Sequence, residues 1–294
     1  MKSELSWKLL YAAREKAAKE GEDIAETYGF TRPPVDPFEI ALAERSLIHL
    51  EEHDFGNAFD GLIRFVGPRF LICCNTKYNA WPHKGARHTK VVFTLAHELG
   101  HFFLPGHRMY LVRSKKPHES FTEFSADPFV EQQADSFATG LLLPGYLFKP
   151  VVNRENFPSQ QTLGDARREF HVSLTGMLVR WTQLSDFPCT TIVIQNGRIQ
   201  YGWISRALRS RGAFRLRYGH QVMGRDAKQF IETDATASSY REGHGAGAIR
   251  NWIDFDETKL LTDEHYFAIP HSGTVWVTAF ADEADLEGRS WDGD

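Results

Sequence analysis

The stretch TKVVFTLAHELGHFFL, residues 89–104, has apolar positions at the spacing of an α-helix. Its apolar stripe consists of Val91, Val92, Leu95, Ala96, Leu99, Phe102 and Phe103. This stripe predicts a single helix packed against a core, which Pro105 and Gly106 bring to an end. Gly100 costs about 1 kcal/mol relative to Ala inside a helix, and so indicates that something approaches the backbone closely there.

Three polar residues of the same stretch, His97, Glu98 and His101, form the pattern HExxH. Residues four apart lie one helical turn apart on the same face, so both imidazoles can bind one ion. Zinc accepts nitrogen and carboxylate ligands, and a catalytic site leaves one position to a water molecule that a neighbouring carboxylate deprotonates. The pattern predicts a zinc site with Glu98 as base; the alternative is a buried helix with incidental histidines.

A third ligand has to come from elsewhere, because HELGHFFLPGH lacks the longer histidine pattern of metzincins. A second helix is expected from Asp127-Pro128 to Pro144, with Glu131 and Asp135 on one face. We expect Glu131 to bind zinc and Asp135 to accept the ring N–H of a ligand histidine. An acidic residue in a first helical turn can also simply complement the helix dipole. The rival ligand candidates are Asp127, Asp135, Glu119 and Glu123.

Composition indicates a cytoplasmic protein. The chain has 294 residues, a net charge of -4 and no apolar run near the roughly 20 residues that cross a bilayer. Its cysteines, Cys73, Cys74 and Cys189, form no disulfide framework, in agreement with a reducing compartment. A thiolate from Cys73 or Cys74 that masks zinc is an alternative to small buried side chains.

The N-terminal part predicts helices followed by a small antiparallel sheet. Residues 4–27 read as two helical pieces interrupted near Gly21, and Asp36-Pro37 starts a short helix. Strands are expected at 46–50, 61–66 and 69–74, the last two as a hairpin. The exposed edge of such a sheet, packed on the HExxH helix, could accept an extended peptide by strand addition.

Residues 159–184 have the outline of a helix-turn-helix around His171-Val172-Ser173. DNA reading requires basic residues on the exposed face of the second helix, where only Arg180 offers charge. We therefore expect a scaffold or substrate-docking segment. After Pro188, TTIVIQNGRIQYGWIS reads as strand, turn and strand, and VWVTAFAD as a further strand. The predicted fold is α+β, with domains at 1–150, 151–187 and 188–294.

Arginines are concentrated in the third domain, in a stretch without Asp or Glu. They are Arg198, Arg206, Arg209, Arg211, Arg215, Arg217 and Arg225, and the interleaved aromatics are Tyr201, Trp203, Phe214 and Tyr218. Arginines that contact phosphates beside aromatics that stack on bases suit single-stranded nucleic acid. The alternative is a solvated basic face paired with the acidic residues between Asp254 and Asp294.

AHELGHFFLPGH, followed by EQQADSFATGLLLP, resembles the ImmA/IrrE family of zinc metallopeptidases, and HExxH plus ExxxD is similar to the thermolysin-like class. The resemblance extends over roughly residues 10–182. His97, His101 and Glu131 match the metal ligands, Glu98 matches the catalytic base, and Asp135 lies where the family has Asp or Asn. A C-terminal sensor-like domain, GAF-like in fold, is consistent with family members of this layout.

The resemblance implies a zinc endopeptidase that cuts a helix-turn-helix repressor, often encoded beside it, and so releases stress, mobile-element or phage-defence genes. Single-stranded DNA or a small molecule is a candidate activator. An oxyanion donor is also expected, with His107, His118 and Tyr146 as candidates. The competing hypothesis is a DNA-binding regulator with a structural metal, whose four positions would all be closed by protein ligands. A third is an inactive peptidase fold used for binding, against which the intact Glu98 argues.

Overall fold

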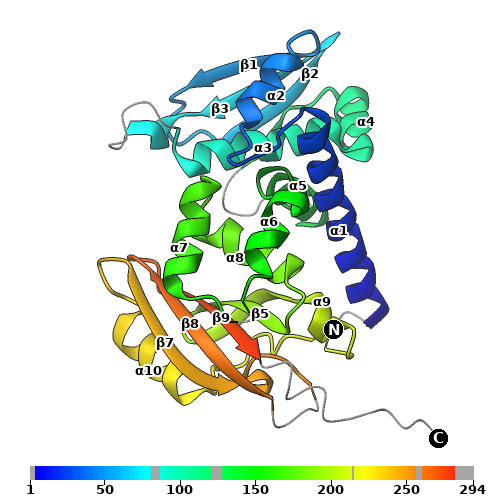
Figure 1. Cartoon of the computed structure of the whole chain (residues 1–294). Helices are drawn as coiled ribbons and strands as arrows, with labels where there is room; N and C mark the ends of the chain where they lie inside the picture. The colour runs from blue at the N-terminus through cyan, green and yellow to red at the C-terminus, as the bar shows by residue number, and fades with distance from the viewer. Residues whose placement is uncertain are drawn as a thin grey trace, which may run out of the picture. The chain divides into compact units, whose positions relative to one another are not determined.

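The computed structural model describes residues 4–80, 87–120, 128–155, 157–213, 215–255 and 260–281 (Figure 1). It consists of two compact units. Unit 1 comprises Met1–Phe148 and Asp165–Met177, and unit 2 comprises Lys149–Gly164 and Leu178–Asp294. The α+β class is as predicted, with helices and two separate sheets. No helix among the described residues is long and apolar enough to span a membrane.

The helices of the first two thirds of the chain include those that the apolar periodicity predicts. They are α1 (Glu4–Thr27), α2 (Pro37–Ala43), η1 (Lys77–Ala80), α3 (Thr89–Phe103), α4 (Pro105–Ser114), α5 (Pro128–Leu142), α6 (Gly145–Val152), α7 (Gln160–Glu169) and α8 (Leu174–Leu184). The HExxH stretch forms α3, whose apolar stripe is buried as predicted except at Phe103, which is half-buried. The carboxylate of Asp36 caps α2 by accepting from Phe38 N at 2.9 Å.

The prediction of two helical pieces in residues 4–27 was wrong, because α1 runs without interruption through Gly21. A Cβ on Gly21 would lie 2.2 Å from the carbonyl oxygen of Phe137 in α5, and a Cβ on Gly140 would lie 2.0 Å from that of Ala18. Both glycines therefore allow the backbones of α1 and α5 to touch. Gly21 marks a close helix contact rather than a break.

The sheet of unit 1 contains β1 (Ile48–His53), β2 (Gly61–Val66), β3 (Arg69–Asn75) and β4 (His118–Ser120), in the order β1-β3-β2-β4. The predicted hairpin is present as β2 and β3. The expectation of an antiparallel sheet was wrong, since β1 pairs with β3 in parallel. The hairpin places β2 on one side of β3, so β1 pairs along the other side. β1 runs in the same direction as β3 because the chain reverses between β1 and β2 and again between β2 and β3. α3 runs beneath this sheet (Figure 1).

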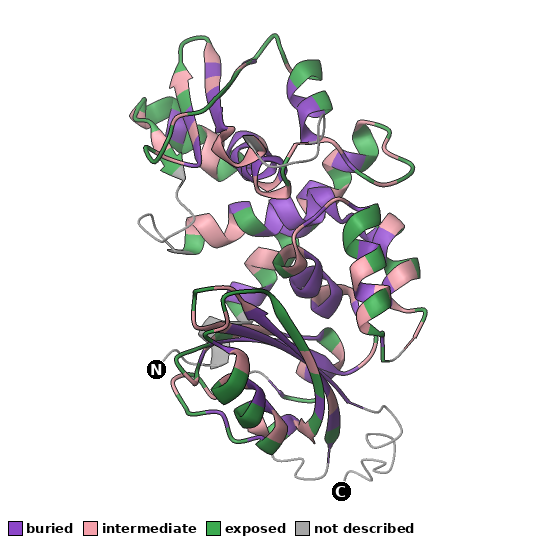
Figure 2. Ribbon diagram, turned by 90° about the vertical axis from the view of Figure 1, so that its left-hand side faces the viewer, coloured by how far each residue is buried: buried purple, intermediate pink, exposed green. Residues whose placement is uncertain are grey.

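Unit 2 contains an antiparallel sheet of five strands in the order β6-β5-β9-β8-β7. The strands are β5 (Cys189–Gln195), β6 (Arg198–Ile204), β7 (Arg241–Ala248), β8 (Leu261–Ile269) and β9 (Thr274–Ala281); the helical segments between them are α9 (Arg206–Arg209), α10 (Arg225–Asp234) and η2 (Ile249–Asn251). The predicted Asn-Gly turn joins β5 to β6, with positive φ at Asn196 and Gly197. Figure 2 shows how much of this sheet is buried.

The two helices of the helix-turn-helix outline are present as α7 and α8, and His171 in the turn between them has a φ of 52°. The expectation that Arg180 lies on an exposed face was wrong, because Arg180 is only 3% exposed. Its Nη1 donates to Gln183 Oε1 at 3.2 Å. The one charged residue expected to face DNA is therefore inside the protein.

Candidate metal centre

His97 and His101 lie one turn apart on the inner face of α3, where both side chains are buried. Their Nε2 atoms are 3.1 Å apart, so both rings present the same nitrogen to one point. The buried apolar stripe orients this face of α3 toward α5 rather than toward solvent. The sequence pattern alone could predict this pair, because it depends only on helical spacing.

Glu131 reaches the histidines from α5. Its Oε2 is 3.3 Å from His97 Nε2, and its Oε1 is 3.8 Å from His101 Nε2. The close approach of α5 depends on Gly100, since a Cβ there would lie 3.3 Å from both the Cα and the carbonyl oxygen of Ala134. Gly100 thus has the role expected of it: a neighbouring backbone packs against α3 at this position.

His118 is a fourth member of the group and comes from β4. It pairs with Ile63 of β2, whose side chain is fully buried, and residues opposite each other in antiparallel strands share a face. His118 therefore faces inward, with its Nε2 3.0 Å from Glu131 Oε1 and its ring centroid 4.2 Å from that of His101. The sequence pattern offers His118 only as a candidate oxyanion donor. Nothing in its sequence spacing relates it to HExxH, because tertiary pairing alone brings it here.

The four side chains form a group that could bind a metal ion. One ligand atom from each of His97, His101, His118 and Glu131 lies within 4.8 Å of the others. The donor set suits a cation, and the fit is supported by two buried atoms, His118 Nε2 and Glu131 Oε1, which face each other at 3.0 Å and have no other hydrogen-bond partner in the described part of the chain. A cation between them would satisfy both atoms.

Asp135 lies behind His97, with its Oδ1 2.9 Å from His97 Nδ1. A carboxylate can only accept here, so His97 carries a proton on Nδ1, and Nε2 is the nitrogen that faces Glu131 and the rest of the group. Arg14 of α1 interacts with Asp135 as well: burial lowers the pKa of Arg14, while the charge of Asp135 raises it. These contacts place Asp135 in the position expected of a hydrogen-bond partner.

His101 is also held by a hydrogen-bonded partner, as His97 is by Asp135, and the sequence did not indicate this partner. Its Nδ1 is 3.1 Å from His107 Nδ1, and His107 Nε2 is 3.2 Å from Gln133 Oε1. Because an amide oxygen only accepts, His107 donates from Nε2 and accepts at Nδ1, so His101 donates from Nδ1. The Nε2 lone pair of His101 is thereby directed into the group. His107 is thus placed behind the ligands.

The electrostatics of the group are those of a cation site. Burial raises the pKa of Glu131, but the facing imidazoles of His118 and His97 outweigh it and hold that pKa well below its usual range. Burial, together with the neighbouring imidazoles of His97 and His118, lowers the pKa of His101. At neutral pH Glu131 is therefore ionised and His101 neutral, the forms that bind metal ions. Burial lowers the pKa of His97, but its hydrogen bonds to Asp135 and Glu131 outweigh burial and raise that pKa well above its usual value, so a metal ion would displace a proton from His97.

Glu98 is fully buried next to this group, and its carboxylate reaches β2. A Cβ on Gly61 would lie 2.3 Å from Glu98 Oε1, so glycine at this position leaves room for the carboxylate. Glu98 is therefore held between the metal group and the sheet.

Other candidates lie away from the group. Cys74 Sγ is 3.5 Å from the carbonyl oxygen of Val91 in α3, and burial raises the pKa of both vicinal thiols, that of Cys73 to about 11. Tyr146 donates to the carbonyl oxygen of Phe30 at 2.7 Å. Glu119 is exposed, whereas 121–127, with the rivals Glu123 and Asp127 and the predicted helix cap, lies outside the described residues.

The predicted arginine patch is centred on α9 and the segment after it. Arg206, Arg211 and Arg215 are exposed, while Arg209 and Arg217 are partly buried. Arg209 Nε and Arg211 Nη1 donate to nearby backbone carbonyls, each at 3.1 Å. Of the aromatics, Tyr201 and Tyr218 are exposed, Trp203 stacks on Trp276, and Phe214 lies outside the described residues.

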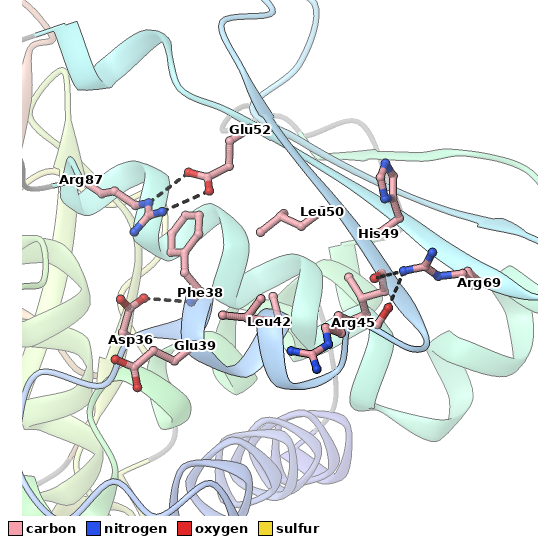
Figure 3. Close-up of a pocket in the computed structure, with 12 residues that line it drawn as sticks. Asp36, Phe38, Glu39, Leu42, Arg45, His49, Leu50, Glu52, Arg69 and Arg87 are labelled. Atoms are coloured by element: carbon pink, nitrogen blue, oxygen red, sulfur yellow. Dashed lines mark hydrogen bonds and ion pairs between the residues drawn. The ribbon is translucent and has the colours of Figure 1, made fainter.

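A separate hollow of about 500 Å³ lies between α2 and β1 (Figure 3). Arg87 crosses it, pairing with Glu52 at 3.0 Å and lying 3.6 Å over the ring of Phe38. Arg69 donates to the carbonyl oxygen of Ile48 at 2.9 Å. These cations already have partners, so the metal group remains the stronger candidate for chemistry.

Comparison with known proteins shows the fold alone. No protein-family model matches the chain, and no curated protein matches it. A solved structure of a Mycobacterium tuberculosis transcriptional regulator is similar, with a TM-score of 0.57 at 10% identity over 98% of each chain. The two proteins thus share their overall fold along nearly their whole length.

Proposed function

We propose that the protein is a zinc-dependent endopeptidase. The observation that carries this proposal is the position of Glu98, a carboxylate that is fully buried against β2 and whose charge acts on His97 of the metal group. A purely structural metal needs its ligands and their hydrogen-bond partners, but it needs no further carboxylate at its side. A hydrolase needs such a group as a general base.

Zinc suits the donor set, because imidazole nitrogens and a carboxylate oxygen are its usual ligands. His97, His101 and Glu131 would hold it, with Asp135 and His107 orienting the two α3 histidines. When bound, zinc supplies a Lewis acid that polarises a peptide carbonyl and makes a water molecule more acidic.

The protein's own residues would carry the proton. Glu98 takes a proton from the attacking water as the new C–O bond forms at the peptide carbonyl, and returns it to the amine as the C–N bond breaks. Each peptide bond thus consumes one water and leaves a carboxylate and an amine, with Glu98 restored. An extended substrate would pair with the edge of β2, which passes directly beside Glu98 at Gly61.

The proposed substrate is a helix-turn-helix repressor encoded beside this protein, as the ImmA/IrrE resemblance implies. The arginine patch of unit 2 is a proposed site for an activating ligand such as single-stranded DNA. The test is to incubate the zinc-loaded full chain with that repressor, with and without single-stranded DNA, and to identify the cut by mass spectrometry. Cleavage that requires zinc and Glu98 is the expected result. If the repressor stays intact under every condition, both with the unaltered chain and with the variant His118→Ala, the proposal is overturned.

The competing proposal is a DNA-binding regulator whose metal is structural. One observation favours it: His118 supplies a fourth protein donor, as in a closed structural site. The burial of Arg180 argues against DNA reading by α8. Metal-dependent binding to a specific duplex without repressor cleavage would support this alternative.

A further inference from the structure

β4 occupies the edge of β2 at the residues that include Gly61, the glycine against which the proposed base lies. It is the outermost strand of its sheet and pairs antiparallel with β2, with Glu119 opposite Leu62 and Ser120 opposite Gly61. Gly61 is the residue against which the Glu98 carboxylate lies. β4 therefore pairs with β2 at the residue that contacts Glu98, along the line that a strand-adding peptide would follow.

The side chain of His118 also takes a place in the metal group. A catalytic zinc site has three protein ligands and leaves the fourth position to water or substrate. Here His97, His101 and Glu131 already supply three donors, and His118 Nε2, 3.0 Å from Glu131 Oε1, adds a fourth. The backbone of β4 and the side chain of His118 thus occupy the two places that a bound peptide and its attacking water would need.

We propose that β4 is an internal inhibitor, which blocks the substrate edge of β2 while His118 closes the fourth position on the metal. The inference rests on the peptidase function proposed above. In this state the protein is latent, and hydrolysis requires β4 to leave β2. Glu119 points to the other face of β4 and is exposed, so it takes no part and provides a matched control.

The first test counts imidazoles on the metal in the unaltered, zinc-loaded full chain by X-ray absorption spectroscopy. Three imidazoles and one carboxylate are expected. Two imidazoles with a water molecule would overturn the proposal. This measurement needs no variant, so it stands even if a substitution at His118 impairs folding.

The second test asks whether removing His118 opens the metal. His118→Ala and the control Glu119→Ala are loaded with cobalt, and binding of acetohydroxamate is followed through the visible spectrum of the metal. His118→Ala should bind the hydroxamate at least about tenfold more tightly than the unaltered protein, because its fourth position is free. Glu119→Ala should behave as the unaltered protein. Equal binding to all three would overturn the inference.

A repressor-cleavage assay separates this inference from the function on which it rests. His118→Ala should cut faster than the unaltered chain. Gain of hydroxamate binding without any cleavage would overturn the peptidase while keeping His118 as the closing ligand. Equal cleavage by the unaltered chain and His118→Ala would keep the peptidase and overturn the internal inhibitor.

Discussion

The carboxylate of Glu98 lies against the backbone of Gly61, and a Cβ at Gly61 would approach Glu98 Oε1 to 2.3 Å. The same Cβ would come within 2.7 Å of Thr94 Cγ2. Only glycine lets β2 lie this close to α3 while Glu98 keeps its position. The proposed base therefore lies against the strand with which the substrate is proposed to pair.

Gly61→Ala should displace the Glu98 carboxylate without removing it. We expect cleavage to fall by on the order of 100-fold, since a misplacement of about 1 Å can cost that much, while zinc content is unchanged. The assay is repressor cleavage in the His118→Ala background, where the edge of β2 is open. Gly106→Ala is the control, because no atom lies within 4 Å of its Cβ. Full activity of Gly61→Ala would show that the exact place of the carboxylate is unimportant.

Glu98→Gln should keep zinc and lose cleavage. The amide has nearly the same shape but cannot accept the proton, and general bases typically contribute about 10²- to 10⁴-fold. Cleavage rate and metal content are measured on the same preparation, again in the His118→Ala background. Retained proteolysis with zinc bound would remove Glu98 from the mechanism.

Asp135→Ala and His107→Ala should each weaken zinc binding by about 10- to 100-fold, because each removes the partner that orients a ligand imidazole. Asp135→Asn keeps an acceptor oxygen and should lose less. Affinity is measured by competition with a fluorescent chelator. If both alanine variants bind zinc as tightly as the unaltered chain, the outer hydrogen bonds have no role in metal binding.

Gly140→Ala should destabilise unit 1. Its Cβ would lie 2.0 Å from the carbonyl oxygen of Ala18, a backbone atom that cannot move aside cheaply. Overpacking of this kind costs typically about 1–3 kcal/mol. The free energy of unfolding from urea titrations provides the comparison, with Gly106→Ala as control. An unchanged midpoint would mean that α1 and α5 can separate at little cost.

Glu264→Gln should flatten the pH dependence of stability. Burial raises the pKa of Glu264 above its ordinary 4.5, although Tyr266, Trp252 and Thr262 donate hydrogen bonds to it. The folded state then holds more protons than the unfolded state between the two pKa values, so the free energy of unfolding falls as pH rises through this window. The difference between the unaltered chain and Glu264→Gln should therefore vary with pH in urea titrations from about pH 4 upward. A constant difference would contradict the shift.

The sequence predicted the elements whose signals are local. α3, α5 and the Asn-Gly hairpin depend on residue spacings within one segment, so the sequence alone predicts where they lie. β4 has only three residues and exists through its pairing with β2, which no local pattern reveals. The sequence therefore did not predict His118 as a possible ligand. The predicted ligands were His97, His101 and Glu131, and the structure adds His118 to them.

Other differences between the predicted and the observed elements arise because a glycine in the sequence can have two structural causes. An isolated glycine in a helical pattern marks either a break or a close contact, and Gly21 is the latter. The glycines of β7 have the same origin: a Cβ on Gly243 would meet the ring of Phe230 at 2.5 Å, and one on Gly247 would meet Glu264 Oε1 at 2.1 Å. Such a strand lacks the β-branched and aromatic residues by which strands are recognised.

The contact between α1 and α5 gives the N-terminal helix an influence on the metal group to which it contributes no donor atom. Gly21 and Gly140 lock the two backbones together, and α5 carries both Glu131 and Asp135. The packing of α1 against α5 therefore helps to fix the positions of both carboxylates relative to α3. A substitution that tilts α1 would move both carboxylates together. The geometry of the metal group can therefore be altered by residues of α1, which are distant from it in the sequence.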